Sequence, residues 1–181
     1  MIGGVKRKLG YDDLAHMPDD GLTREILDGE LFVTPSPSPL HQRISKRLQR
    51  QIEAYFEDRG LGEVFNAPLD TILGPHDVAQ PDVLVVTNSS LVTKRAIEGP
   101  PVLVVEILSP ATAARDRAVK ADRYAAAGVA HYWIVDPEAR RLECLHLVNG
   151  RYVVASAGSG DDTLEDAAWP GLIVQLAELW R

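Results

Sequence analysis

The sequence predicts an α/β (α+β) fold with a central mixed β-sheet, flanked by helices and preceded by an N-terminal β-hairpin. Three near-continuous apolar runs are typical of buried strands: 81–86, 102–109 and 131–136. Apolar residues recur at helical spacing over 40–59, and a second helix pattern follows the middle run. The order of hairpin, helix, strands, helix and strands fits one sheet covered by helices, so we expect a single domain over residues 1–181.

Composition narrows the class of protein. The chain has 181 residues, 45% of them hydrophobic and 25% charged, which suits one globular core. No apolar run approaches the ~20 residues of a membrane span, and the first residues lack the apolar stretch of a signal peptide. The single cysteine, Cys144, cannot form an internal disulfide, and we expect it in the core. We therefore expect a cytoplasmic protein that does not cross a membrane.

The net charge of −7 counts against nucleic-acid binding, which usually needs a basic surface. The basic residues nevertheless cluster in two places: Arg43, Lys46, Arg47 and Arg50, and Arg115, Arg117, Lys120 and Arg123. An ordinary solvated face explains the first cluster well. Local basic faces still permit weak, salt-dependent binding to nucleic acid.

In the N-terminal half, the sequence predicts an initial segment over 1–22 with a short helix near 11–16, followed by a hairpin over 24–33. Asp28-Gly29 is a strong two-residue turn signal, which places Glu25 and Glu30 on one face of the hairpin. Three prolines make 34–40 an extended connector. In the helix that follows, a buried stripe is expected from five residues: Ile44, Leu48, Ile52, Tyr55 and Phe56.

Beyond the first helix we expect one strand over 63–73, a turn over 74–80, and either a loop or a short exposed helix over 88–100. Ser109 and Pro110 predict the start of the second helix, as N-cap and first helical residue, and Gly128 its end. Further predictions are a hairpin turning on Asn149-Gly150, a polar stretch over 156–163 and a short C-terminal helix.

Asp82 and Glu106 are carboxylates within predicted strands whose other residues are mostly apolar and expected in the core. A buried carboxylate is costly unless a charged or hydrogen-bonding group meets it. Glu106 lies ~10 Å before the end of its strand, and Lys120 lies ~10 Å along the following helix, so the two can lie level. Asp116 and Tyr124 share the helix face of Lys120.

These residue types suit metal-assisted hydrolysis of a phosphodiester. Mg²⁺ prefers carboxylate oxygens and keeps several waters. The ion lowers the pKa of a bound water and polarises a phosphoryl oxygen, and a nearby lysine can neutralise charge that develops on the phosphate.

The ordered set of motifs resembles the PD-(D/E)XK nuclease superfamily and, more narrowly, the Uma-type putative restriction endonuclease family of bacterial proteins. The resemblance spans nearly the whole chain, through these segments: DGEL (28–31), His41, PD (81–82), VVEILSP (104–110), SPAT…D…K…Y (109–124), YWIVDP (132–137) and PGL (170–172). It implies a restriction-endonuclease-like fold, a Mg²⁺ (or Mn²⁺) site and cleavage of nucleic acid, with DNA as the expected substrate. A homodimer is expected because two cuts on a duplex favour two-fold symmetry.

The resemblance also implies roles for particular residues. Asp82 and Glu106 would bind the metal, with Glu30 completing its shell, and Lys120 would be the catalytic lysine. Their positions in the sequence, rather than the resemblance, make His41, Asp116 and Tyr124 candidates for supporting roles. Arg115, Arg117 and Arg123 are candidates for phosphate contacts. The alternative is a helix-start residue for His41 and an ordinary solvated helix face for the others. One position departs from the superfamily motif: Leu108 stands where a lysine is expected, two residues after the acid.

Two other functions stay open. The net charge and Leu108 favour a non-catalytic nucleic-acid-binding or interaction domain that retains the nuclease fold. A metal-dependent hydrolase of a small phosphorylated substrate is the third. The histidines His76, His131 and His146 show no metal-ligand spacing in the sequence, and there is no Gly-rich phosphate loop or GxSxG motif.

Overall fold

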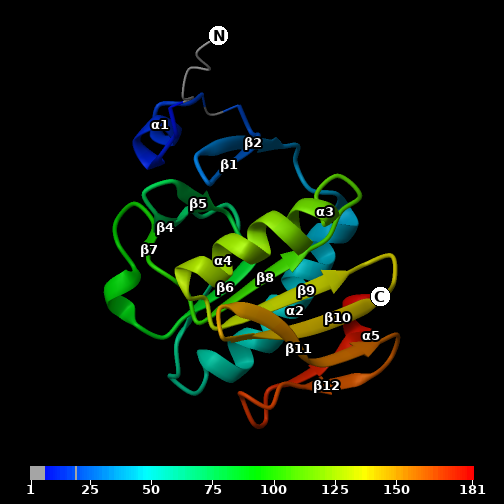
Figure 1. The fold of residues 1–181 in the computed structure, drawn as a ribbon. Coiled ribbons are helices and arrows are strands. Elements are labelled where there is room, and N and C mark those ends of the chain that lie inside the picture. Colours follow the sequence, from blue (N-terminus) through cyan, green and yellow to red (C-terminus); the bar gives the residue numbers. More distant parts are fainter. Residues whose placement is uncertain (1–6, 19) are drawn as a thin grey trace.

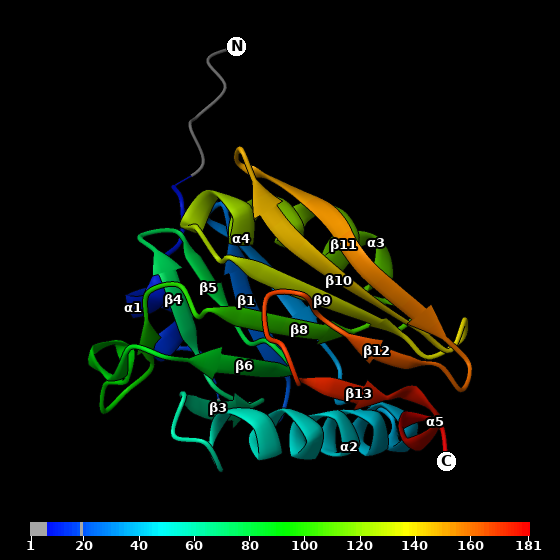
Figure 2. The same ribbon diagram turned by 90° about the horizontal axis from the view of Figure 1, so that it is seen from below.

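The computed structural model describes residues 7–18 and 20–181, so the first six residues of the expected initial segment lie outside it. The described chain is a mixed α/β structure with a six-stranded sheet, a five-stranded sheet and a two-stranded ribbon. Helix α2 (Pro39–Phe56) covers one face of the six-stranded sheet and helix α4 (Ala121–Ala127) covers the other (Figures 1 and 2). The predicted arrangement of a mixed sheet between helices is confirmed.

The six-stranded sheet has the order β11-β10-β9-β8-β6-β3. Its strands, in chain order, are β3 (Glu63–Asn66), β6 (Val83–Val86), β8 (Leu103–Ile107), β9 (His131–Asp136), β10 (Arg141–Val148) and β11 (Arg151–Ser159). Strands β8 and β9 are parallel, and the other neighbours are antiparallel. The helical segment between β8 and β9 is therefore the crossover that a parallel pair requires.

Side chains of the central strands alternate between two cores. Val105 and Trp133 belong to the core under α2, whereas Val104 and Tyr132 belong to the core under α4, with Tyr124. Glu106 follows the same alternation and faces α4. Cys144 is buried, as expected.

The N-terminal part begins with α1 (Tyr11–Ala15) and the predicted hairpin. The five-stranded sheet has the order β2-β1-β5-β4-β7 and comprises β1 (Thr23–Leu27), β2 (Glu30–Thr34), β4 (Thr71–Gly74), β5 (Asp77–Ala79) and β7 (Ile97–Glu98). Asp28 and Gly29 have φ of 50° and 80°, the positive values that a type I′ turn needs.

The prediction of a single strand over 63–73 is wrong. Its two halves are β3 and β4, which belong to different sheets, and Pro68 lies between them, where a missing N–H interrupts strand pairing. The expected turn over 74–80 contains β5. The loop or short helix expected over 88–100 contains a 3₁₀ turn, η1 (Ser89–Leu91), and β7.

Helix α2 begins one residue earlier than expected and ends at Phe56. The Ser38 hydroxyl accepts a hydrogen bond from the His41 N–H at 3.2 Å, which fixes the first turn. The predicted stripe of apolar residues is buried along the whole helix.

The helix after β8 starts later than predicted. Ser109 and Thr112 form a hydrogen-bonded turn, and α3 (Ala113–Arg115) follows it. A π-helical segment, η2 (Asp116–Lys120), then leads into α4, which ends at Gly128 with φ of 84°. Single π turns inside helices are frequent at functional sites.

The C-terminal part contains the second predicted hairpin, with Asn149 and Gly150 at φ of 50° and 77°. Strand β11 extends to Ser159, so the expected polar stretch over 156–163 is partly strand. The chain closes with β12 (Thr163–Glu165), β13 (Ile173–Gln175) and α5 (Leu176–Leu179). No helix in the described part of the chain has the length and apolar character that crossing a membrane requires.

Candidate active site

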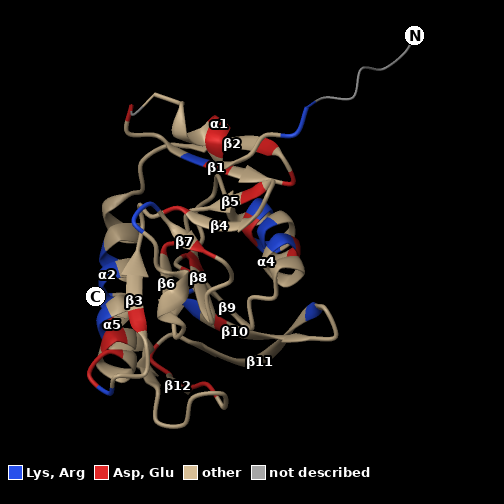
Figure 3. Cartoon of the chain, turned by 90° about the vertical axis from the view of Figure 1, so that its left-hand side faces the viewer, with Lys and Arg blue, Asp and Glu red and all other residues tan. Residues whose placement is uncertain are grey.

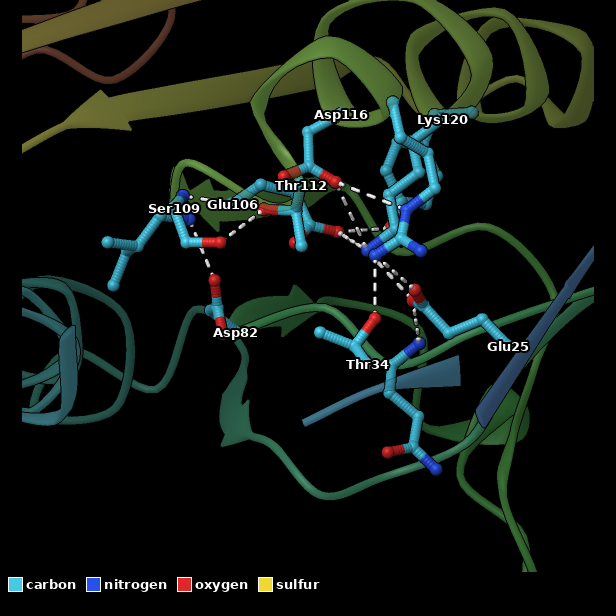
Figure 4. Close-up of polar contacts among 12 residues, drawn as sticks. Glu25, Thr34, Asp82, Glu106, Ser109, Thr112, Asp116 and Lys120 are labelled. Carbon is cyan, nitrogen blue, oxygen red and sulfur yellow. Dashed lines mark hydrogen bonds and ion pairs between the residues drawn. The ribbon is translucent and has the colours of Figure 1, made fainter. Parts of the chain in front are cut away.

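A cleft of about 740 Å³ lies between the β1–β2 hairpin, the start of α2 and the connection from β8 to α3. Asp82, Glu106 and Lys120 all line it. The structure therefore brings together the three residues that the sequence singled out, from β8, the segment before β6 and the π turn (Figure 4).

Glu106 and Lys120 form a buried ion pair. Glu106 is 4% exposed and Lys120 is 3% exposed, and the Lys120 Nζ lies 2.8 Å from the Glu106 Oε1. The Tyr124 hydroxyl donates a second hydrogen bond to the same oxygen at 2.6 Å. The predicted face of Asp116, Lys120 and Tyr124 thus points at Glu106, with Asp116 3.8 Å from the ammonium.

Glu25, on β1, is a site residue that sequence reasoning missed. It is 2% exposed, and its Oε1 lies 2.8 Å from the Lys120 Nζ and accepts a hydrogen bond from the Gln80 N–H at 2.9 Å. Glu30, expected to complete the metal shell, is instead exposed and does not line the cleft. The two acids share a hairpin face, but Glu30 lies beside the turn opposite Leu27, whereas Glu25 lies farther along, toward the cleft.

Asp82 is held by the backbone of β8 and by His41. Its Oδ2 accepts a hydrogen bond from the Ile107 N–H at 2.7 Å and lies 3.2 Å from the His41 Nε2. The same imidazole nitrogen lies 3.1 Å from the Ile107 carbonyl oxygen. Burial acts to lower the pKa of His41, whereas the hydrogen bond to Asp82 and its negative charge act to raise it. The net shift of the pKa is upward. The His41 Nε2 is thus placed to orient the Asp82 carboxylate.

The carboxylates of the cleft are crowded. Five of them line it, together with the cationic side chains of Arg115 and Lys120 and the imidazole of His41. Burial raises the pKa of Glu106 and of Asp116, and the Lys120 ammonium opposes both shifts. For Lys120, burial acts to lower the pKa, but Glu106, Glu25 and Asp116 together raise it, so the ammonium keeps its proton.

The donor set fits a hard divalent cation. Asp82 and Glu106 offer carboxylate oxygens, and the buried Asp116 Oδ1 has no hydrogen-bond partner among the described residues. A Mg²⁺ or Mn²⁺ ion would offset the excess of carboxylates and bind the oxygen that accepts no hydrogen bond.

Of the three arginines expected to contact phosphate, only Arg115 lines the cleft, where it donates to the Thr34 Oγ1 at 2.9 Å. Arg117 pairs with Glu143 at 2.6 Å and Arg123 with Asp77 at 2.6 Å, both away from the cleft. Figure 3 shows that basic residues lie on α2 and on α4, as the sequence indicated. The expectation for Arg117 and Arg123 is corrected, because local carboxylates already bind both guanidinium groups.

Comparisons with known proteins identify a family and a fold for this chain. The family model described as "Uma2: Putative restriction endonuclease" matches residues 11–177. Among solved structures, the chain is similar to a putative nuclease belonging to DUF820 from Anabaena variabilis ATCC 29413, with a TM-score of 0.78 and 17% sequence identity. The similarity covers 95% of this chain and 97% of the other.

None of the curated protein sequences matches this chain significantly. The structural likeness establishes a restriction-endonuclease-like fold. Because the family model covers nearly all of the sequence, the chain belongs to the Uma2 family of putative restriction endonucleases.

Proposed function

We propose that the protein is a metal-dependent endonuclease that hydrolyses phosphodiester bonds in nucleic acid, with DNA as the substrate. The observation that supports this most strongly is the meeting of Asp82, Glu106 and Lys120 in one cleft, with the lysine 2.8 Å from Glu106. Family membership and the fold point the same way.

In this proposal Asp82 and Glu106 bind Mg²⁺ or Mn²⁺, and Asp116 contributes its Oδ1, which accepts no hydrogen bond among the described residues. The bound ion would polarise a phosphoryl oxygen and make a water more acidic. Lys120 stays protonated because of its three acidic neighbours, so it can stabilise negative charge that develops on the phosphate. Arg115 lines the cleft as a second cation for the phosphate.

His41 and Glu25 act through other groups. His41 orients the Asp82 carboxylate through the contact at 3.2 Å, and Glu25 shares the Lys120 ammonium with Glu106. The homodimer and the cytoplasmic location expected from the sequence remain predictions.

The test is a nuclease assay on plasmid, linear duplex, single-stranded DNA and RNA, with Mg²⁺, with Mn²⁺ or with EDTA. We expect cleavage of DNA that needs the metal, and a loss of about 100-fold or more in Asp82→Asn, Glu106→Gln and Lys120→Met. Glu63→Gln, which neutralises an exposed carboxylate on β3, is the matched control. Calorimetric titration of Mg²⁺ and Mn²⁺ into the wild type and Glu106→Gln tests the metal site separately.

One observation favours the alternative of a non-catalytic binding or interaction domain. The Lys120 ammonium already contacts two carboxylates, so the cluster can serve folding alone. No cleavage of any substrate by the folded wild type, together with no change in metal binding in Glu106→Gln, would favour this alternative.

A further inference from the structure

A second group of potential metal ligands lies outside the cleft and consists of His131, His146 and Asp166. One ligand atom from each lies within 4.8 Å of the other two. His131 on β9 and His146 on β10 are directly opposite in the antiparallel register, and Asp166 follows β12. The sequence spacing of these histidines gives no sign of this group, because strand pairing brings together residues that are far apart in the sequence.

The imidazole of His131 is held in place but makes no hydrogen bond among the described residues. Its ring contacts the His146 ring edge-on, with centroids 4.6 Å apart, and packs on Trp169 at 4.2 Å. Its Nδ1 is buried without a partner. A buried polar nitrogen in this position needs an explanation, because leaving it unpaired is unfavourable.

The Asp166 carboxylate is oriented toward His146 by donors of its own. It is 1% exposed, and it accepts hydrogen bonds from the Trp133 Nε1 at 3.1 Å and from the Ala168 N–H at 2.9 Å. The His146 Nε2 lies 2.8 Å from the Asp166 Oδ1 and 3.0 Å from the Oδ2. Outer donors that fix a carboxylate are typical of the surroundings of metal ligands.

We propose that His131, His146 and Asp166 bind a divalent transition-metal ion, with Zn²⁺ as the best match. Two imidazoles and one carboxylate form a three-ligand set that leaves a fourth position open, and the side chain of His146 is 22% exposed, which gives the ion access. Nitrogen ligands also distinguish this site from the all-oxygen set of the cleft.

The two sites are separate in space. His131 and Trp133 face the core under α2, whereas Glu106 faces α4 from the other side of the sheet. A bound ion would tie β9 and β10 to the segment that leads into β13, which contains Trp169. The proposal therefore does not depend on nuclease activity.

The experiment is a titration of the metal-free full-length protein with Co²⁺, followed by competition with Zn²⁺. We expect one equivalent to give the visible absorption of a four-coordinate cobalt site, which Zn²⁺ then abolishes. His131→Phe keeps the aromatic packing on Trp169 but removes both nitrogens, and it should lower affinity at least about tenfold. His16→Gln, at an exposed histidine after α1, should bind as the wild type does.

A second readout separates a ligand from a structural residue. Zn²⁺ should raise the Tm of the wild type and of Glu106→Gln, but not that of His131→Phe, whose Tm without metal should equal that of the wild type. Three results would overturn the proposal: no cobalt absorption in the wild type, unchanged affinity in His131→Phe, or a loss of the absorption in Glu106→Gln. Any of them would leave an ordinary His146–Asp166 pair.

Discussion

Replacing Lys120 with methionine removes the ammonium and keeps most of the side chain's apolar stem. The ammonium is 2.8 Å from an oxygen of Glu106 and 2.8 Å from one of Glu25, and both carboxylates are nearly inaccessible to water. Removing one partner of a buried ion pair costs about 3–5 kcal/mol, because the other charge is left uncompensated. We expect a loss of that size in the free energy of unfolding at pH 8.

The loss should depend on pH in a defined direction. Without the ammonium, the pKa of Glu106 rises further in the folded state, so the folded protein holds a proton that the unfolded chain has released. Stability then falls as pH rises toward the folded pKa, by about 1.4 kcal/mol per pH unit for each such proton. The deficit relative to the wild type should therefore be smaller at pH 5 than at pH 8.

Urea unfolding followed by tryptophan fluorescence, from pH 5 to pH 8, measures this deficit. Lys46→Met, at an exposed lysine on α2, is the matched control and should change stability by less than about 0.5 kcal/mol. A deficit under about 1 kcal/mol that does not vary with pH would refute the reasoning, since Lys120 would then not be the counter-ion of the buried acids.

Three further predictions concern other residues that line the cleft. Glu25→Gln keeps an acceptor for Lys120 and for the Gln80 N–H, so unfolding in urea should show a loss of only about 1.5–3 kcal/mol. Asp116→Asn removes a carboxylate whose pKa is raised by burial. The variant should therefore be more stable than the wild type by about 1 kcal/mol at high pH and equally stable near pH 4. Calorimetry should show that it binds Mn²⁺ more weakly. Because the pKa of His41 is raised in the folded state, protonated His41 stabilises the fold below pH ~6.5, and this stabilisation is lost as pH rises through the folded pKa. In His41→Gln, the free energy of unfolding should lack this pH-dependent change of about 1 kcal/mol.

Local signals were enough to predict much of the fold. Asp28-Gly29 and Asn149-Gly150 need positive φ at both turn positions, and both hairpins form there. The stripe of α2 is a repeat within one helix, so its burial follows from spacing alone. The error over 63–73 has the opposite origin: both halves favour strand, but only tertiary pairing decides that β3 and β4 join different sheets.

The candidate site was predictable where a residue conflicts with its surroundings. Asp82 and Glu106 stood out because charge is rare in apolar runs, and the structure places both in the cleft. Glu25 did not stand out, because an acid at alternate positions of a hairpin fits an exposed face equally well. Its burial depends on Lys120, which comes from a segment far along the chain, and a single sequence does not show that contact.

Lys120 places a positive charge beside Glu106, although Leu108 stands where the resemblance to the PD-(D/E)XK superfamily implies a lysine. Leu108 follows Glu106 on the same side of the strand and is buried in the core under α4, with Tyr124 and Tyr132. Leu108 also lines the cleft, and a lysine at that position would lose the packing of the leucine in this core. The ammonium comes instead from Lys120 in the π turn over Asp116–Lys120. The same turn places Asp116 3.8 Å from this ammonium. The crossover therefore supplies the positive charge next to Glu106, and position 108 holds an apolar residue of the core under α4.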